Sequence, residues 1–117
     1  LKLLDEVSLA SDPEINERLR QDPGKVAAFG QFPLPGARDA FVVDTIERVH
    51  RILAPTLVIW GEDDELDPVS TAVELHRRLA CEKDLRIIPG NGHAGHLDRN
   101  RKEVFEATRD WCLKYLT

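Results

Sequence analysis

Two loops carry residue types suited to proton transfer. The first is "GEDDELDP", Gly61–Pro68, which is rich in carboxylates. The second is "GNGHAGH", Gly90–His96, which places two histidines among small residues. An imidazole titrates near neutral pH, and it accepts a proton from a nucleophile or water most effectively when a carboxylate fixes its tautomer. The two loops therefore favour general acid–base chemistry, provided that the fold brings them together.

The elements around these loops predict that it does. Strands are expected at Thr56–Trp60 and Leu85–Pro89, and helices at Val69–Ala80 and about Arg101–Leu116. Strand, helix, strand, helix indicates a parallel βαβ unit with a right-handed crossover. Both loops follow the carboxyl ends of strands, where open parallel sheets bind their ligands. The first strand is apolar on both faces, so we expect it to be buried on both sides.

The N-terminal part is predicted to be helical but broken. A helix begins at Pro13, capped by Ser11 or Asp12, and carries the apolar stripe of Ile15 and Leu19. The Asp-Pro-Gly at 22–24 ends it. An apolar loop at 28–36 precedes a second expected helix, about 37–53, which stops at an Ala-Pro pair.

The stretches "APTLVIWGEDDELDP" and "LRIIPGNGHAGH" resemble the C-terminal half of the α/β-hydrolase fold family. In that family a G-x-x-D turn holds the catalytic acid and a G-x-G-H loop holds the histidine, in the order Ser, Asp, His. The resemblance implies that Asp64 and His93 are catalytic. "SDPEINERLRQDPG" is similar to the cap segment of monoacylglycerol lipases, lysophospholipases and serine aminopeptidase-like hydrolases. Together these resemblances imply an α/β fold, with a partial helical cap, or lid, at 1–53 and the C-terminal βαβα part of the core at 54–117.

The nucleophile of that family is missing. It lies in G-x-S-x-G on a strand-to-helix elbow, and none of Ser8, Ser11 and Ser70 has this context. The oxyanion-hole loop, an N-terminal feature of the family, is missing as well. Two strands do not make a stable open sheet, and the chain does not begin with Met. We therefore expect the N-terminal half of the same protein to supply the nucleophile. The residue type of this nucleophile is undecided between Ser, Asp and Cys.

Each candidate residue also has a simpler explanation. Asp64 is a turn carboxylate that can cap the following helix or face solvent. Asp63 and Asp67 are rivals for the role of the acid, and Asp67, just before Pro68, is the better predicted helix cap. His96 is expected to pack or hydrogen-bond beside the site. We predict no metal and no cofactor, because the acidic and histidine loops lack both a zinc-binding helix and calcium-loop spacing.

Charge and hydropathy limit the classes of partner that we expect for this chain. The 117 residues carry a formal net charge of −5 and a sequence pI near 5.3, which disfavours nucleic acid and anionic membranes. No run approaches the roughly 18 apolar residues of a membrane helix, so we expect no stable membrane insertion. Cys81 and Cys112 have no metal spacing and are predicted to be reduced, partly buried thiols. A cytoplasmic location is expected.

Two functional hypotheses remain. In the first, the chain is the C-terminal fragment of a serine hydrolase that cleaves carboxylic esters or lipid acyl groups. Phe29, Phe32 and Leu34 then line an acyl pocket, or else pack the cap on the main domain. In the second, it is a degenerate or truncated non-catalytic module, although decay is expected to remove Asp64 or His93. Peptidase, epoxide and haloalkane hydrolysis also stay open, and the chain alone is expected to be inactive.

Overall fold

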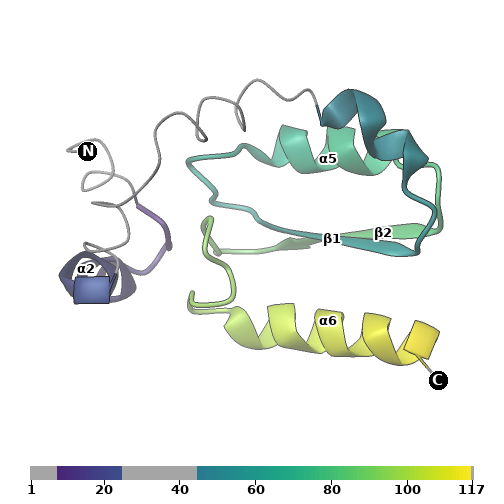
Figure 1. Cartoon of the computed structure of the whole chain (residues 1–117). Helices are drawn as coiled ribbons and strands as arrows, with labels where there is room; N and C mark the ends of the chain where they lie inside the picture. Colours follow the sequence, from purple (N-terminus) through teal and green to yellow (C-terminus); the bar gives the residue numbers. More distant parts are fainter. Residues whose placement is uncertain (1–7, 25–44, 117) are drawn as a thin grey trace.

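The computed structural model describes residues 8–24 and 45–116 (Figure 1). In chain order its elements are α2 (Pro13–Gln21), the 3-10 helix η1 (Ile46–Arg51), β1 (Thr56–Gly61), α5 (Val69–Arg78), β2 (Lys83–Ile88) and α6 (Arg101–Leu116).

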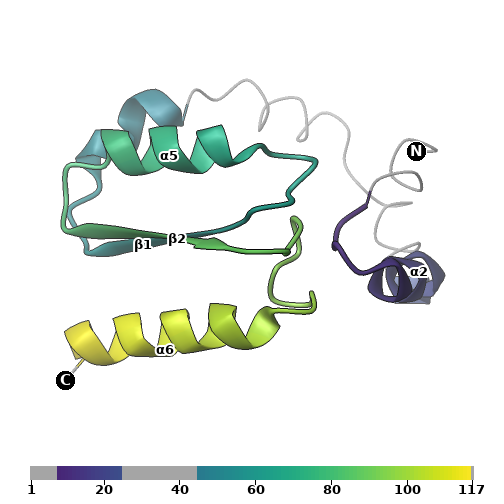
Figure 2. The ribbon, with the colours of Figure 1, turned by 180° about the vertical axis from the view of Figure 1, so that it is seen from behind.

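The two strands form a parallel sheet between two helical layers. Thr56 lies opposite Lys83 at one end of the pairing, and Gly61 lies opposite Ile88 at the other. Helix α5 and η1 cover one face of the sheet, and α6 covers the opposite face (Figures 1 and 2). This arrangement confirms the predicted parallel βαβα unit of an α/β protein.

The core lies between the sheet and α5. Val58, Ala72 and Leu79 are buried there, and half-buried apolar side chains from η1 and both strands pack around them. The first strand was expected to be buried on both faces, but only Val58 and Gly61 are fully buried and the rest of β1 is half-buried. The reason is the narrow sheet: among the described residues it has two strands, so each strand leaves one edge open.

Helix α2 begins as the sequence predicts. The Asp12 side chain accepts a hydrogen bond from the Glu14 N–H at 2.9 Å, and Pro13 occupies the first turn. Asp12, rather than Ser11, is therefore the cap. The helix ends at Gln21, and it lies at the end of the sheet from which the two candidate loops emerge (Figure 1).

Three other expectations need correction. The strand expected at Leu85–Pro89 runs from Lys83 to Ile88, because the Thr56 N–H already pairs with the Glu82 carbonyl and Pro89 has no N–H to donate. Of the helix expected at 37–53, the described part is a 3-10 helix at 46–51, and 37–44 lies outside the described residues. Cys112 was expected to be partly buried but is exposed, and three apolar helical side chains are exposed as well: Val73 by 50%, Phe105 by 56% and Leu116 by 82%. A helix over a two-stranded sheet buries only a narrow stripe, here half-burying Val104, Trp111 and Tyr115.

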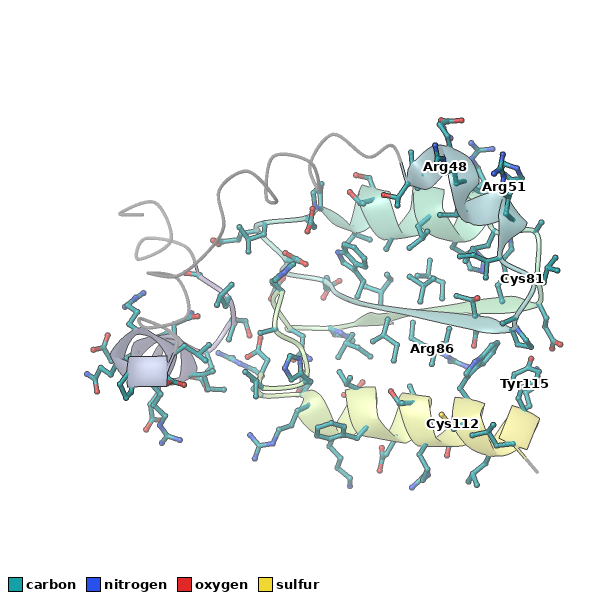
Figure 3. The ribbon with its side chains drawn as sticks, in the orientation of Figure 1. Arg48, Arg51, Cys81, Arg86, Cys112 and Tyr115 are labelled. Atoms are coloured by element: carbon teal, nitrogen blue, oxygen red, sulfur yellow. The ribbon has the colours of Figure 1, made fainter. Side chains whose placement is uncertain are left out.

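The two cysteines are free and lie in different layers. Cys81 follows α5 and is half-buried, whereas Cys112 lies on α6 (Figure 3). The Cys81 thiol is 3.5 Å from the Thr56 hydroxyl. The prediction of a partly buried thiol is confirmed for Cys81 and wrong for Cys112.

Arg48 and Arg51 extend from η1 on the side away from the sheet (Figure 3). Across the described ranges, no helix is both long and apolar enough to cross a bilayer.

Candidate active site

The end of β1 is pressed against the histidine loop. A Cβ atom on Gly61 would lie 2.3 Å from the carbonyl oxygens of both Asn91 and Gly92, so only glycine fits there. Beyond it, the Glu62 N–H donates to the Ile88 carbonyl at 3.0 Å, and the Asp63 N–H donates to the Asn91 carbonyl at 2.8 Å. Backbone hydrogen bonds thus hold the acidic loop against the histidine loop.

These hydrogen bonds bring Asp64 close to His93. The Asp64 Oδ2 atom is 3.0 Å from His93 Nδ1, which is hydrogen-bond distance. The other carboxylate oxygen, Oδ1, accepts from the N–H groups of Leu66 and Asp67, each at 3.0 Å. The Asp64 side chain is only 4% exposed. Its own loop therefore holds the carboxylate in place, and one oxygen is directed at the imidazole.

The imidazole is left with one nitrogen for chemistry. An ionised carboxylate only accepts hydrogen bonds, so His93 Nδ1 is the donor and Nε2 is the basic nitrogen. The His93 side chain is 41% exposed. A neutral imidazole held in this tautomer is suited to accept a proton from a hydroxyl or a water at Nε2.

Neither of the two rival carboxylates, Asp67 and Asp63, hydrogen-bonds to the ring. The Asp67 Oδ2 atom is 3.8 Å from His93 Nδ1, beyond hydrogen-bond distance. The Asp67 carbonyl accepts from Trp60 Nε1 at 2.8 Å, which ties this part of the loop to β1. Asp67 was expected to cap the next helix, but α5 has Pro68 at its N-cap and no side-chain cap. Asp63 is exposed, and its backbone N–H, rather than its carboxylate, joins the two loops.

His96 lines a pocket of about 210 Å³ together with His93. The floor of this pocket is apolar and comes from both strands and α6, through Ile59, Trp60, Ile88 and Val104. His96 is exposed and shares the lining of this pocket with His93, and its expected packing or hydrogen bonding beside the site stays a prediction. Ser70 lies on the surface of α5 and outside this pocket.

Sequence reasoning missed a buried carboxylate behind the histidine loop. Asp98 is fully buried, and both of its oxygens are occupied. Oδ2 accepts from the N–H groups of Ser11 and Gly92, each at 2.7 Å. Oδ1 accepts from Arg99 N–H at 2.8 Å, the Ser11 hydroxyl at 3.1 Å and Asp12 N–H at 3.3 Å. Burial acts to raise the pKa of Asp98, but these donors outweigh it, and the pKa lies below its ordinary value.

Asn91 was also missed as a buried group. Its side chain is fully buried, donates to the Gly95 carbonyl at 3.2 Å and accepts from the Asn100 N–H at 3.0 Å. A Gly-Asn-Gly sequence signals a turn, and Gly90 does adopt a positive φ of 63°. Nothing in a single sequence, however, distinguishes an Asn or Asp buried inside a loop from one that faces solvent.

The fold and the paired loops define an α/β hydrolase, and comparison with known proteins agrees. Residues 3–107 match the model of the alpha/beta hydrolase family, so the chain belongs to this family.

Two curated relatives match nearly the whole chain. The alpha/beta hydrolase domain-containing protein aho-3 of Caenorhabditis elegans is 34% identical over 107 residues, covering 84% of the chain and 32% of that protein. A monoacylglycerol lipase of Mycolicibacterium smegmatis is 28% identical over 116 residues, covering 97% of the chain and 41% of the lipase. The chain thus spans about a third to two-fifths of the length of these relatives.

Solved structures give the same result. A malate-bound thermophilic esterase from Thermogutta terrifontis matches with a TM-score of 0.63 and 25% identity, over 87% of the chain and 36% of the esterase. A variant of a meta-cleavage product hydrolase matches with a TM-score of 0.68 and 24% identity, over 97% of the chain and 44% of that protein. The second likeness concerns the fold alone.

Proposed function

We propose that the chain is the acid–histidine part of a serine hydrolase that cleaves carboxylic esters with a lipid-like acyl group. His93 is the general base and Asp64 is the carboxylate that orients it. The observation that carries the proposal is the 3.0 Å contact between Asp64 Oδ2 and His93 Nδ1, which leaves Nε2 as the basic nitrogen. A catalytic histidine needs this arrangement, because the carboxylate fixes the tautomer and stabilises the imidazolium that forms.

In the proposed reaction His93 first accepts a proton and then donates it. Nε2 takes the proton of a serine hydroxyl as its oxygen attacks the ester carbonyl carbon, and the tetrahedral intermediate forms. Nε2 then returns the proton to the leaving alcohol, and an acyl-enzyme remains. A water molecule then attacks the acyl-enzyme while Nε2 takes its proton. Nε2 returns this proton to the serine oxygen, and the carboxylic acid is released. Asp64 stays ionised throughout.

A serine nucleophile and an oxyanion hole would complete the proposed site, and no serine of the sequence lies in G-x-S-x-G. We propose that the N-terminal half of the same protein supplies them above the His93 ring. The ester class is supported by the monoacylglycerol lipase and esterase relatives. The lid role of 1–53, an acyl pocket at Phe29, Phe32 and Leu34, and the cytoplasmic location stay predictions, and those three side chains lie outside the described residues.

The proposal is tested in the complete protein with two matched histidine variants. His93→Ala removes the base and should lower kcat on a short-chain activated ester by about 10⁴-fold or more. His96→Ala removes an exposed imidazole from the same loop and should change kcat by less than about tenfold. Equal kcat losses in the two variants, or full activity in His93→Ala, would rule out His93 as the base. Activity on epoxides or haloalkanes in place of esters would assign another chemistry to the same pair.

A further inference from the structure

We propose that Asp98 is a positioning residue that holds the His93 loop against residues 9–12, so that this N-terminal segment helps to set the position of the catalytic base. The inference rests on the proposed function, because it assumes that His93 is the base. Asp98 itself does not touch the imidazole.

The contacts of Asp98 join two distant parts of the chain. Its Oδ2 atom accepts from the N–H of Gly92, the residue before His93, and from the N–H of Ser11. Ser11 lies 87 positions before Asp98 in the sequence. Its Oδ1 atom accepts from the Ser11 hydroxyl and from the Asp12 N–H on the same N-terminal side. A single buried carboxylate thus bridges the histidine loop and the segment that leads into α2.

The residues on both sides of His93 are tied to the same segment. Gly92 is held through Asp98, and the Ala94 N–H donates directly to the Leu9 carbonyl at 2.6 Å. Packing adds to these bonds, because a Cβ on Gly92 would lie 3.0 Å from the backbone of Ala10 and Ser11. The backbone on either side of His93 therefore cannot shift without breaking a contact to residues 9–12.

Helix capping does not account for this geometry. Asp98 lies just before α6, where a capping side chain would accept from the N–H groups of the first helical turn. Instead, four of the five donors to its carboxylate come from Gly92, Ser11 and Asp12, and the fifth is the adjacent Arg99 N–H. The Ser11 hydroxyl shares its single proton between Asp98 Oδ1 and the Gly90 carbonyl, so the same serine contacts the loop at a second point. The carboxylate therefore holds the His93 loop and does not cap α6.

An amide at position 98 cannot replace the carboxylate. Each oxygen accepts from at least two donors, and the NH₂ of an asparagine would face N–H groups on whichever side it lies. The buried donors on that side lose their partner, and the loop and the segment separate there. A shift of about 1 Å in a catalytic group lowers the rate by about 10²-fold.

The experiment uses the complete protein with Asp98→Asn and Ser11→Ala, and with Asp110→Asn and Ser70→Ala as exposed controls on α6 and α5. We expect Asp98→Asn to lower kcat by about 10²-fold while KM changes by less than about threefold. Ser11→Ala removes the hydroxyl but keeps the N–H donor, so its loss in kcat should be smaller, about fivefold. Amide hydrogen exchange at Gly92 and Ala94 should become faster in both variants and stay unchanged in the controls.

The results separate a positioning role from a purely structural one. Faster exchange at Gly92 and Ala94 with unchanged kcat would overturn the inference, as would unchanged exchange in Asp98→Asn. If Asp98→Asn does not fold, Ser11→Ala decides, and an unchanged kcat in that variant also overturns the inference. Failure of the proposed function has a different signature: His93→Ala would keep its activity, whereas the exchange data would still report whether Asp98 holds the loop.

Discussion

The Asp64 carboxylate bridges its own loop and the His93 imidazole. One oxygen takes the N–H groups of Leu66 and Asp67, and the other lies 3.0 Å from His93 Nδ1. The carboxylate is thus oriented by backbone donors rather than by the histidine. Because the acidic loop is also bonded to the histidine loop through its backbone, the geometry of the pair depends on how closely the two loops approach.

The first prediction concerns that approach. Gly61→Ala places a Cβ 2.3 Å from the Asn91 and Gly92 carbonyl oxygens, so the loops must separate. We expect the free energy of unfolding to fall by about 2 kcal/mol or more, as for other overpacked sites. Urea denaturation of the complete protein measures it.

Gly24→Ala is the matched control, because Gly24 is exposed and its nearest contact is the end of the Asp22 side chain. It should change the free energy of unfolding by about 0.5 kcal/mol or less. Equal effects of the two substitutions would show that the close approach at Gly61 does not constrain the loops.

The second prediction concerns the neighbouring carboxylate. Asp67 Oδ2 lies 3.8 Å from His93 Nδ1, too far for a hydrogen bond, and its side chain is 50% exposed. Solvent weakens such an interaction, so Asp67→Asn should lower kcat by about tenfold at most. Steady-state kinetics on an activated ester provide the measurement. A loss as large as that of Asp64→Asn would make Asp67 an equal partner of the histidine.

The third prediction concerns acid stability. The pKa of Asp98 is lowered in the folded protein, because backbone and hydroxyl donors outweigh the opposing effect of burial. Its contribution to stability is therefore complete above the unfolded pKa of about 3.9 and is lost as the pH falls through the lower folded value. The charged groups nearby are Arg99, whose guanidinium donates to the Ser11 carbonyl, and Asp12, whose carboxylate caps α2.

The measurement is urea denaturation of the wild-type protein and Asp98→Asn over a range of pH. The difference in the free energy of unfolding should be largest near neutrality and shrink below about pH 4. Asp110→Asn, which removes an exposed carboxylate, is the control. A difference that stays constant down to about pH 2 would mean that folding does not shift the pKa of Asp98, and would contradict this prediction.

The fourth prediction is that residues 1–117 alone do not hydrolyse esters. They hold the proposed base and its orienting carboxylate but no serine in G-x-S-x-G, and general-base assistance by itself contributes about 10²–10⁴-fold. The purified chain should give background turnover of short-chain and long-chain activated esters and no labelling by a fluorophosphonate probe. Labelling at Ser70 with saturable turnover would contradict this prediction and the proposed site.

Regular elements and chemistry-bearing loops were predictable from the sequence. The apolar run at Thr56–Trp60 and the pattern at Arg101–Leu116 gave elements close to those observed, because periodicity and breakers act locally. The parallel order then placed the acidic and histidine loops at one edge. Those inferences needed no knowledge of packing.

Residues whose environment is set by distant parts of the chain were not predictable. Asp98 and Asn91 look like ordinary loop residues, and their burial depends on Ser11 and Asn100 packing over them. Phe105 has the helical spacing of a core residue, but its exposure depends on how wide the neighbouring sheet is. The position of Asp67 before Pro68 is typical of a helix cap, yet the loop turns its side chain towards His93.

The most direct test of the Asp64–His93 pair is the kcat of two adjacent variants of the complete protein, Asp64→Asn and Asp63→Asn. Both remove one negative charge from the same loop, but only Asp64 hydrogen-bonds to the imidazole. Loss of the orienting carboxylate should lower kcat by about 10⁴-fold in Asp64→Asn, and Asp63→Asn should stay within about tenfold of the wild type. A crippled Asp63→Asn, or an Asp64→Asn variant with wild-type kcat, would contradict the assignment of Asp64 as the catalytic acid.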